Sequence, residues 1–146
     1  MNLVSFLSGE APDFAGRYLD DILAFGDDQV ETTHDFIQLV FPLLEPSRSS
    51  FHGVYLSQED VEVIKEHPHI ERNLRNSAEW FLGFLRRNPA WRERYNHNQL
   101  RITRAIKSLR ILVSDHEADN FRSEIMEMVD TSDLINQEAL AYWRDA

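Results

Sequence analysis

The chain contains no cysteine among its 146 residues. It therefore has no disulfide, no thiolate ligand for zinc or an iron–sulfur cluster, and no cysteine nucleophile. No stretch approaches the roughly 18 consecutive apolar residues of a membrane-spanning helix. The N-terminus also lacks the basic residues that open a secretory signal peptide. From these absences we expect a protein of the reducing cytoplasm, without a membrane span.

Positive charge is also scarce. The 15 basic and 25 acidic residues give a formal net charge of −10. Nucleic acids and anionic membranes are bound by cationic surfaces, because much of the affinity comes from the release of counterions. The charge balance therefore predicts that nucleic acid is not a partner. The 42% hydrophobic content is typical of a globular protein, and we expect residues 1–146 to form one domain.

Glycine and proline are few, five of each, and they separate helical patterns of apolar residues. No alternating pattern predicts a strand. The sequence thus predicts an all-α fold, a single compact bundle of six or seven helices. Ser57, Ser114 and Ser132 are the expected N-caps of three of them. The expected helices cover about residues 12–25, 29–41, 57–65, 69–87, 98–113, 114–129 and 132–143, with a loop at 45–55.

The helix expected at 98–113 is apolar on two sides, which is typical of a helix buried at the centre of a bundle. Arg101 and Arg104 lie beside its minor apolar side, so we expect both to be partly shielded from water. A shielded guanidinium requires a partner. An internal carboxylate from Asp35, Glu31 or Glu79 could serve, and so could an external carboxylate or phosphate.

Polar side chains border the apolar arcs of two expected helices. His34 and Gln38 border the arc of the helix at 29–41. Asn98 is the expected N-cap of the helix at 98–113, and His97 lies just outside that helix. Docking the two arcs would bring their margins together. The predicted binding centre consists of His34, Gln38, His97, Asn98, Arg101 and Arg104.

Recognisable catalytic and metal-binding motifs are lacking. His34-Asp35 has none of the further spacing of a metal phosphohydrolase, and His67-Pro68-His69 reads as a solvated helix entrance. There is no glycine-rich phosphate loop and no nucleophile elbow. We therefore expect no metal and no cofactor, and the sequence leans against an enzyme.

Two further patterns favour packing over binding. Trp80, Trp91, Tyr95 and Trp143 are expected in the core. Residues 86–110 hold eight basic and one acidic residue, whereas residues 1–35 hold eight acidic and one basic residue and residues 115–146 hold nine acidic and two basic ones. This segregation predicts that the basic segment packs between its two acidic flanks, with a cationic patch for an acidic partner as the alternative.

Two longer motifs resemble a known family. The segment from His34 to Pro42, HDFIQLVFP, resembles the His-x-x-Ile-Gln-x-x-Phe-Pro element of the opioid growth factor receptor conserved region. The segment from His97 to Arg104, HNQLRITR, resembles that family's His-Asn-x-Leu-Arg-Ile-Thr-Arg element. Leu39 stands where the family commonly has tryptophan. The resemblance implies a soluble helical domain that binds enkephalin-type peptides, here a compact member without the repeat-bearing tail.

Three functional hypotheses follow from these patterns. The first is a non-catalytic binding or interaction domain whose ligand is a peptide. The second is an enzyme or sensor that holds a small anionic metabolite through Arg101 and Arg104, with His34 or His97 as general acid or base. The third is a structural module that self-associates. The oligomeric state stays open.

Overall fold

Every regular element is a helix within residues 1–46, 53–130 and 132–146, the residues that the computed structural model describes. The predicted all-α class is confirmed. These residues form nine α-helices and one short 3₁₀ helix, more than the six or seven expected. The predicted loop at 45–55 lies partly outside the described residues. None of the described helices combines the length and the apolar character that crossing a membrane requires.

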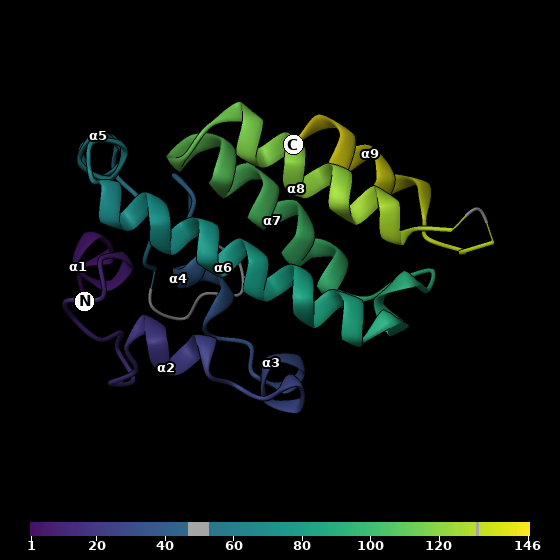
Figure 1. Ribbon diagram of the computed structural model, residues 1–146, viewed down its shortest axis with the longest axis horizontal. Helices are drawn as coiled ribbons and strands as arrows, with labels where there is room; N and C mark the ends of the chain where they lie inside the picture. Colours follow the sequence, from purple (N-terminus) through teal and green to yellow (C-terminus); the bar gives the residue numbers. More distant parts are fainter. Residues whose placement is uncertain (47–52, 131) are drawn as a thin grey trace. The chain divides into compact units, whose positions relative to one another are not determined.

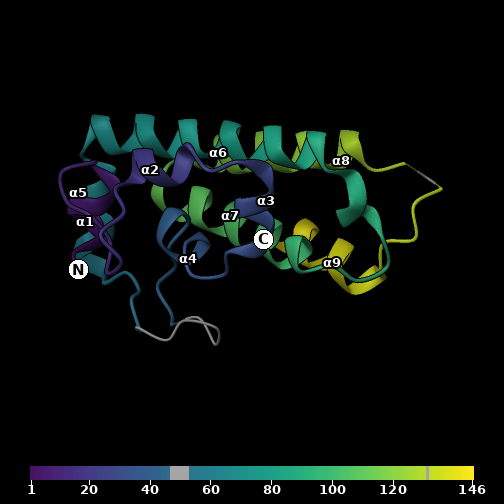
Figure 2. The same ribbon diagram turned by 90° about the horizontal axis from the view of Figure 1, so that it is seen from below.

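The chain divides into two compact units, Met1–Ser77 and Ala78–Ala146, and α6 (Pro68–Arg87) contributes to both. The first unit holds α1 (Leu3–Leu7), α2 (Leu19–Leu23), α3 (Asp27–Thr32), α4 (Ile37–Val40) and α5 (Gln58–Lys65) (Figure 1). Within it, α1 contacts α4 and α5, and Figure 2 shows α1 beside α5. The predicted Ser57 cap is confirmed: its side chain accepts from the main-chain N–H of Asp60.

The prediction of one helix over residues 12–25 is wrong, because only Leu19–Leu23 is helical. The Asp13 carboxylate accepts hydrogen bonds from the main-chain nitrogens of Ala15 and Arg17 at 2.8 and 2.9 Å. Gly16 adopts a φ of +78°, which closes this turn in the left-handed region. An aspartate that bonds its own local backbone competes with helix formation, and here the turn prevails.

The helix expected at 29–41 is also wrong in extent. It is interrupted between α3 and α4, where Thr33 is extended with φ −95° and ψ 128°. Two consecutive β-branched residues, Thr32 and Thr33, weaken helix propensity at this point. The break places His34 and Asp35 in the connection between two short helices. The short helix α1 was not expected; Asn2 caps it by accepting from Ser5 N.

The second unit is organised around α7 (His97–Leu112), which contacts α8 (Asp115–Met128), α9 (Gln137–Asp145) and the 3₁₀ helix η1 (Pro89–Arg92) (Figure 1). Its core includes Phe81, which stacks on Phe121 with a ring-centroid distance of 6.3 Å. Trp91 and Trp143 meet edge to face at 6.2 Å. That α7 is the central helix of the whole chain stays a prediction.

Helix starts in the second unit correct two predicted caps. Ser114 caps α8 as expected, accepting from Glu117 N at 3.1 Å. Asn96, and not Asn98, caps α7, so His97 is the first helical residue and Asn98 lies within the first turn. Asn136, and not Ser132, caps α9, with its side chain 2.7 Å from Ala139 N. In both corrected cases a second cap-forming residue stood within a few positions.

Candidate functional site

Two of the predicted site residues lie in the first unit. The side chain of His34 is exposed, whereas Gln38 on α4 is 5% exposed. The Gln38 side-chain amide donates to the main-chain carbonyl of His34 at 3.2 Å. Gln38 thus supports the connection between α3 and α4 through the backbone of His34, while the imidazole is left accessible.

Asp35 takes part in an ion-pair cluster of the first unit. Arg17 donates from Nη1 to Asp35 Oδ1 at 2.9 Å and from Nε to Asp13 Oδ2 at 2.7 Å. The Asp13 carboxylate is fully buried, so Arg17 supplies the charge that a buried carboxylate requires. One of the three carboxylates proposed as a partner for Arg101 or Arg104 is therefore already bound to Arg17.

The other four predicted residues lie on α7 in the second unit. His97 is exposed at its start, whereas Asn98 and Arg101 are 2% and 5% exposed. Arg101 donates from Nη1 to Asn98 Oδ1 at 3.2 Å, one turn earlier. Arg104 is half-buried. The expected shielding of both arginines is thus observed. That these residues face His34 and Gln38 stays a prediction.

Gln99, which sequence reasoning passed over, connects three segments of the second unit. Its buried side-chain amide donates to the carbonyl oxygens of Trp91 and Glu93 at 3.0 and 2.8 Å. Its Oε1 accepts from the Asn136 side chain at 3.0 Å. A buried amide with these partners fixes the loop before α7 and the start of α9 against α7.

A pocket of about 400 Å³ opens between the first half of α7 and α9. Leu100 and Tyr95 are each 70% exposed and Tyr142 is 48% exposed, so large apolar surfaces border it. The expectation that Tyr95 belongs to the core is therefore wrong, although it is right for Trp91 and Trp143. The residues that line the pocket are Tyr95, Asn96, His97, Gln99, Leu100, Thr103, Asn136, Glu138, Ala139 and Tyr142.

The acidic side of the pocket is built by two residues one turn apart on α9. The Tyr142 hydroxyl donates to Glu138 Oε1 at 3.0 Å. This hydrogen bond, together with the nearby negative charge, raises the pKa of Tyr142 above its ordinary value. The pair holds a carboxylate beside an aromatic ring at the surface of the protein.

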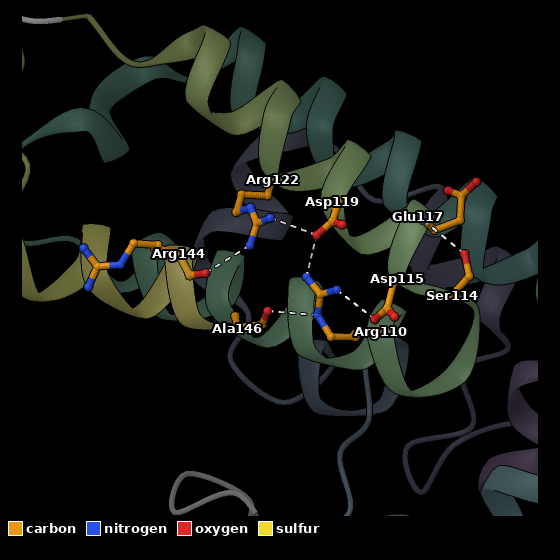
Figure 3. A network of polar contacts seen from close by, with 8 residues as sticks. All are labelled: Arg110, Ser114, Asp115, Glu117, Asp119, Arg122, Arg144 and Ala146. Carbon is orange, nitrogen blue, oxygen red and sulfur yellow. Dashed lines mark hydrogen bonds and ion pairs between the residues drawn. The ribbon is translucent and has the colours of Figure 1, made fainter.

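The far end of α9 is held by two arginines from α7 and α8 (Figure 3). Arg110 Nε donates to the Ala146 carbonyl at 2.9 Å, and Arg122 Nη1 donates to the Arg144 carbonyl at 3.1 Å. Asp119 accepts from both arginines at 2.8 Å. The last carbonyls of a helix have no partner within the helix, and these cations satisfy two of them.

Charges of the basic segment 86–110 pair with those of the acidic flank 115–146, as predicted, whereas packing of the basic segment against the acidic flank 1–35 stays a prediction. Arg86 and Glu124 approach to 2.6 Å, and Arg110 bridges Asp115 and Asp119. The hydrogen bond that Arg110 donates to Asp119 raises the pKa of Arg110 and lowers the pKa of Asp119. These pairs are partly exposed, so each contributes little to stability by itself.

The histidine pair at the start of α6 serves the helix end. His67 Nδ1 accepts from the main-chain nitrogen of Ile70 at 3.3 Å, and His69 is exposed. This agrees with the predicted helix entrance. Among the described residues, no group of three or more histidine and acidic side chains is arranged to hold a metal ion.

Sequence reasoning located one edge of the pocket and missed the opposite one. On α7, His97 was singled out and Leu100 was not. On α9, neither Glu138 nor Tyr142 was singled out. Two signals were present in the sequence: Leu100 interrupts the polar side of α7, and Glu138 precedes Tyr142 by four residues, which places them on the same helix face.

Comparison with known proteins gives one consistent result. The family described as the opioid growth factor receptor conserved region matches residues 13–146. The chain is 32% identical to the opioid growth factor receptor of Homo sapiens over 152 aligned positions, which cover 88% of the chain and 22% of that relative. It is 31% identical to the receptors of Rattus norvegicus and Mus musculus over 69% of the chain.

The chain spans about a fifth of the length of these curated relatives, 22%, 21% and 19%. No solved structure matches it.

Proposed function

Because the chain belongs to the opioid growth factor receptor conserved-region family, we propose that it is a binding domain for a short peptide of the opioid, enkephalin-like type and that it catalyses no reaction. The match runs from residue 13 to residue 146 and includes parts of both compact units. This supports the proposal that residues 1–146 act as one domain. The cytoplasmic location inferred from the sequence stays a prediction.

The pocket between α7 and α9 is the observation that supports ligand binding best. Four of its lining residues, His97, Gln99, Leu100 and Thr103, belong to the segment HNQLRITR that carries the family resemblance. In this segment Gln99 is buried and builds the pocket floor, whereas Leu100 is 70% exposed. A mostly apolar cavity with a few polar groups and a large exposed apolar side chain at its edge is typical of a binding site.

Burial separates the six residues of the predicted centre into two groups. Gln38, Asn98 and Arg101 are at most 5% exposed, which supports a structural role for them. His34 and His97 are exposed and Arg104 is half-buried, so these side chains could reach a ligand. Of the six residues, His97 is the member that also lines the pocket.

The alternative of an enzyme or sensor for a small anionic metabolite has less support. Arg101 is nearly buried and donates to Asn98, and neither Arg101 nor Arg104 lines the pocket. The pocket carries Glu138, whose carboxylate would repel an anion. For the self-association alternative, light scattering over a concentration series is the direct test.

Peptide binding can be tested with one pocket leucine and one matched control. An enkephalin-type peptide labelled at its C-terminus is titrated with the wild-type protein, Leu100→Ser and Leu134→Ser, and fluorescence anisotropy reports the affinity. Leu134 is 76% exposed and lies outside the pocket. We expect Leu100→Ser to weaken binding about tenfold, because burial of a leucine side chain contributes about 1.5–3 kcal/mol.

The Leu134→Ser variant should bind like the wild-type protein. Failure of the wild-type protein to bind the peptide at millimolar concentration, or equal affinity of the two variants, would refute peptide binding in this pocket.

A further inference from the structure

The charge of the pocket between α7 and α9 limits what it can take. Among the described residues that line it, Glu138 is the one acidic residue, and there is no lysine or arginine. The chain as a whole carries a formal charge of −10, which raises the local concentration of cations. An anionic group would therefore be disfavoured, and a group with one positive charge would find a matching carboxylate.

The walls of the same pocket are aromatic and aliphatic. Tyr95 and Tyr142 line it and are 70% and 48% exposed, and Leu100 on α7 is 70% exposed. Aromatic rings pack well against other rings in offset or edge-to-face geometry, and their faces attract cations. A ring that carries a nearby ammonium group would satisfy the walls and the carboxylate together.

The position of Glu138 is fixed from both sides. Its backbone belongs to the first turn of α9, which Asn136 caps, and its Oε1 accepts the hydroxyl of Tyr142 at 3.0 Å. A carboxylate has about four acceptor positions, so one hydrogen bond from tyrosine leaves capacity for an ammonium donor. The tyrosine ring and the carboxylate thus form a pre-arranged pair, which lowers the entropy lost on binding.

We propose that this pocket binds the N-terminal residue of a peptide whose first side chain is aromatic. The α-ammonium group pairs with Glu138, and the ring packs against Leu100 and the two tyrosines. The volume of about 400 Å³ lies at the small end of the range of ligand pockets, roughly 300–1,000 Å³, and is suited to one large residue and not to a long segment. The proposal rests on the proposed function in that it takes the ligand to be a peptide.

Three small probes separate the contributions of the ring and the charge. Tyramine carries a phenol ring and an ammonium group, p-cresol carries the ring alone, and 4-hydroxyphenylacetate carries the ring with a negative charge. Amide chemical shifts of the ¹⁵N-labelled protein report both the affinity and the place of binding. We expect tyramine to shift the amides of Tyr95, Leu100 and Glu138 and to bind about tenfold more tightly than p-cresol.

The matched variants are Glu138→Gln and Glu127→Gln. Each substitution removes one exposed negative charge and keeps the shape of the side chain, but Glu127 lies on α8 and outside the pocket. Glu138→Gln should reduce tyramine binding to the level of p-cresol, and Glu127→Gln should leave it unchanged. Equal binding of tyramine and p-cresol to the wild-type protein, or no effect of Glu138→Gln, would overturn the proposal.

The peptide experiment then distinguishes this site from the proposed function. An enkephalin-type peptide and its N-acetylated form are titrated into the wild-type protein. Loss of binding on acetylation supports the site. Equal binding of both forms overturns the site and leaves peptide binding standing, whereas selective binding of tyramine without binding of the peptide supports the pocket chemistry and refutes the opioid-peptide function.

Discussion

The indole nitrogen of Trp143 donates a hydrogen bond of 3.1 Å to the main-chain carbonyl of Gln99, a residue 44 positions earlier in the chain. The side chain of the same glutamine binds the carbonyls of Trp91 and Glu93. One residue of α7 therefore joins η1, the loop before α7 and α9. The floor of the α7–α9 pocket depends on this junction.

Replacing Trp143 with phenylalanine should destabilise the protein by about 1–3 kcal/mol. The substitution keeps an aromatic ring near Trp91 but removes the indole donor to the Gln99 carbonyl and leaves part of a fully buried site unfilled, and both changes are costly. Urea unfolding followed by circular dichroism measures the loss. Tyr142→Phe is the control: Tyr142 is the neighbouring residue and is 48% exposed, so this substitution should change stability much less than Trp143→Phe.

Gln99→Leu should destabilise the protein more than the similar size of the two side chains would suggest. Leucine has similar bulk but offers no donor for the carbonyls of Trp91 and Glu93 and no acceptor for Asn136, so we expect a loss of about 2–4 kcal/mol in urea unfolding. Thr103→Val on the same helix removes a single hydroxyl donor to the Gln99 carbonyl and should cost less. A loss below that of Thr103→Val would contradict the role of Gln99.

Acid should weaken the attachment of α9 through Asp119. The hydrogen bond from Arg110 holds the pKa of Asp119 below its ordinary value of 3.8, so the unfolded state takes up the proton first as pH falls. The stabilising contribution is therefore complete above about pH 5 and is lost as pH falls through the lower folded pKa. The unfolding free energies of the wild-type protein and Asp119→Asn, measured in urea, should differ near neutral pH and converge as pH falls through the lowered pKa of Asp119. A difference that persists at low pH would contradict this.

Alkali should act on α9 through Tyr142. Its pKa lies above the ordinary value of 10.0, first because its hydroxyl donates to Glu138. The stability from this bond is present below pH 10 and is lost as pH rises through the raised folded pKa. Tyrosinate absorbance, with Tyr142→Phe to identify the signal, should show a lower pKa for Tyr142 in Glu138→Gln. An unchanged pKa in this variant would mean that the charge of Glu138 does not raise the pKa of Tyr142.

Arg104→Ala tests whether this half-buried guanidinium is structural. If an internal group holds it, the substitution strands that partner and should cost on the order of 3 kcal/mol. Lys107→Ala, an exposed cation on the same helix, is the control. A loss for Arg104→Ala no larger than about 0.5 kcal/mol would overturn the structural role, because surface substitutions usually stay within that limit.

The long amphipathic helices were predictable because many residues report the same period. The pattern at 69–87 and 98–113 reproduces α6 and α7 to within two residues at each end. The first 41 residues were not, since their helices have four to six residues and are governed by single side chains. The turn at Asp13 depends on local hydrogen bonding and the break at Thr33 on the low helix propensity of β-branched residues, and the hydrophobic period records neither.

The candidate site was half predictable for a related reason. His97 stands out as a polar residue at a helix start, whereas Glu138 and Tyr142 matter only because α9 returns beside α7. That return is fixed by the bonds of Gln99 to Asn136 and Trp143, which are 37 and 44 residues away. Contacts at such separations carry no signature in one sequence.

The attachment of α9 at both ends has a consequence for its kinetics of opening. A helix of nine residues is too short to persist alone in water, so α9 is helical only while it is docked. Its amide hydrogens should therefore exchange with solvent deuterium as a group, at a rate set by undocking and not by fraying from one end. A ligand that touches both Leu100 and Glu138 would bridge the moving helix to the fixed one, and occupancy of the pocket would be recorded as slower exchange along the whole of α9.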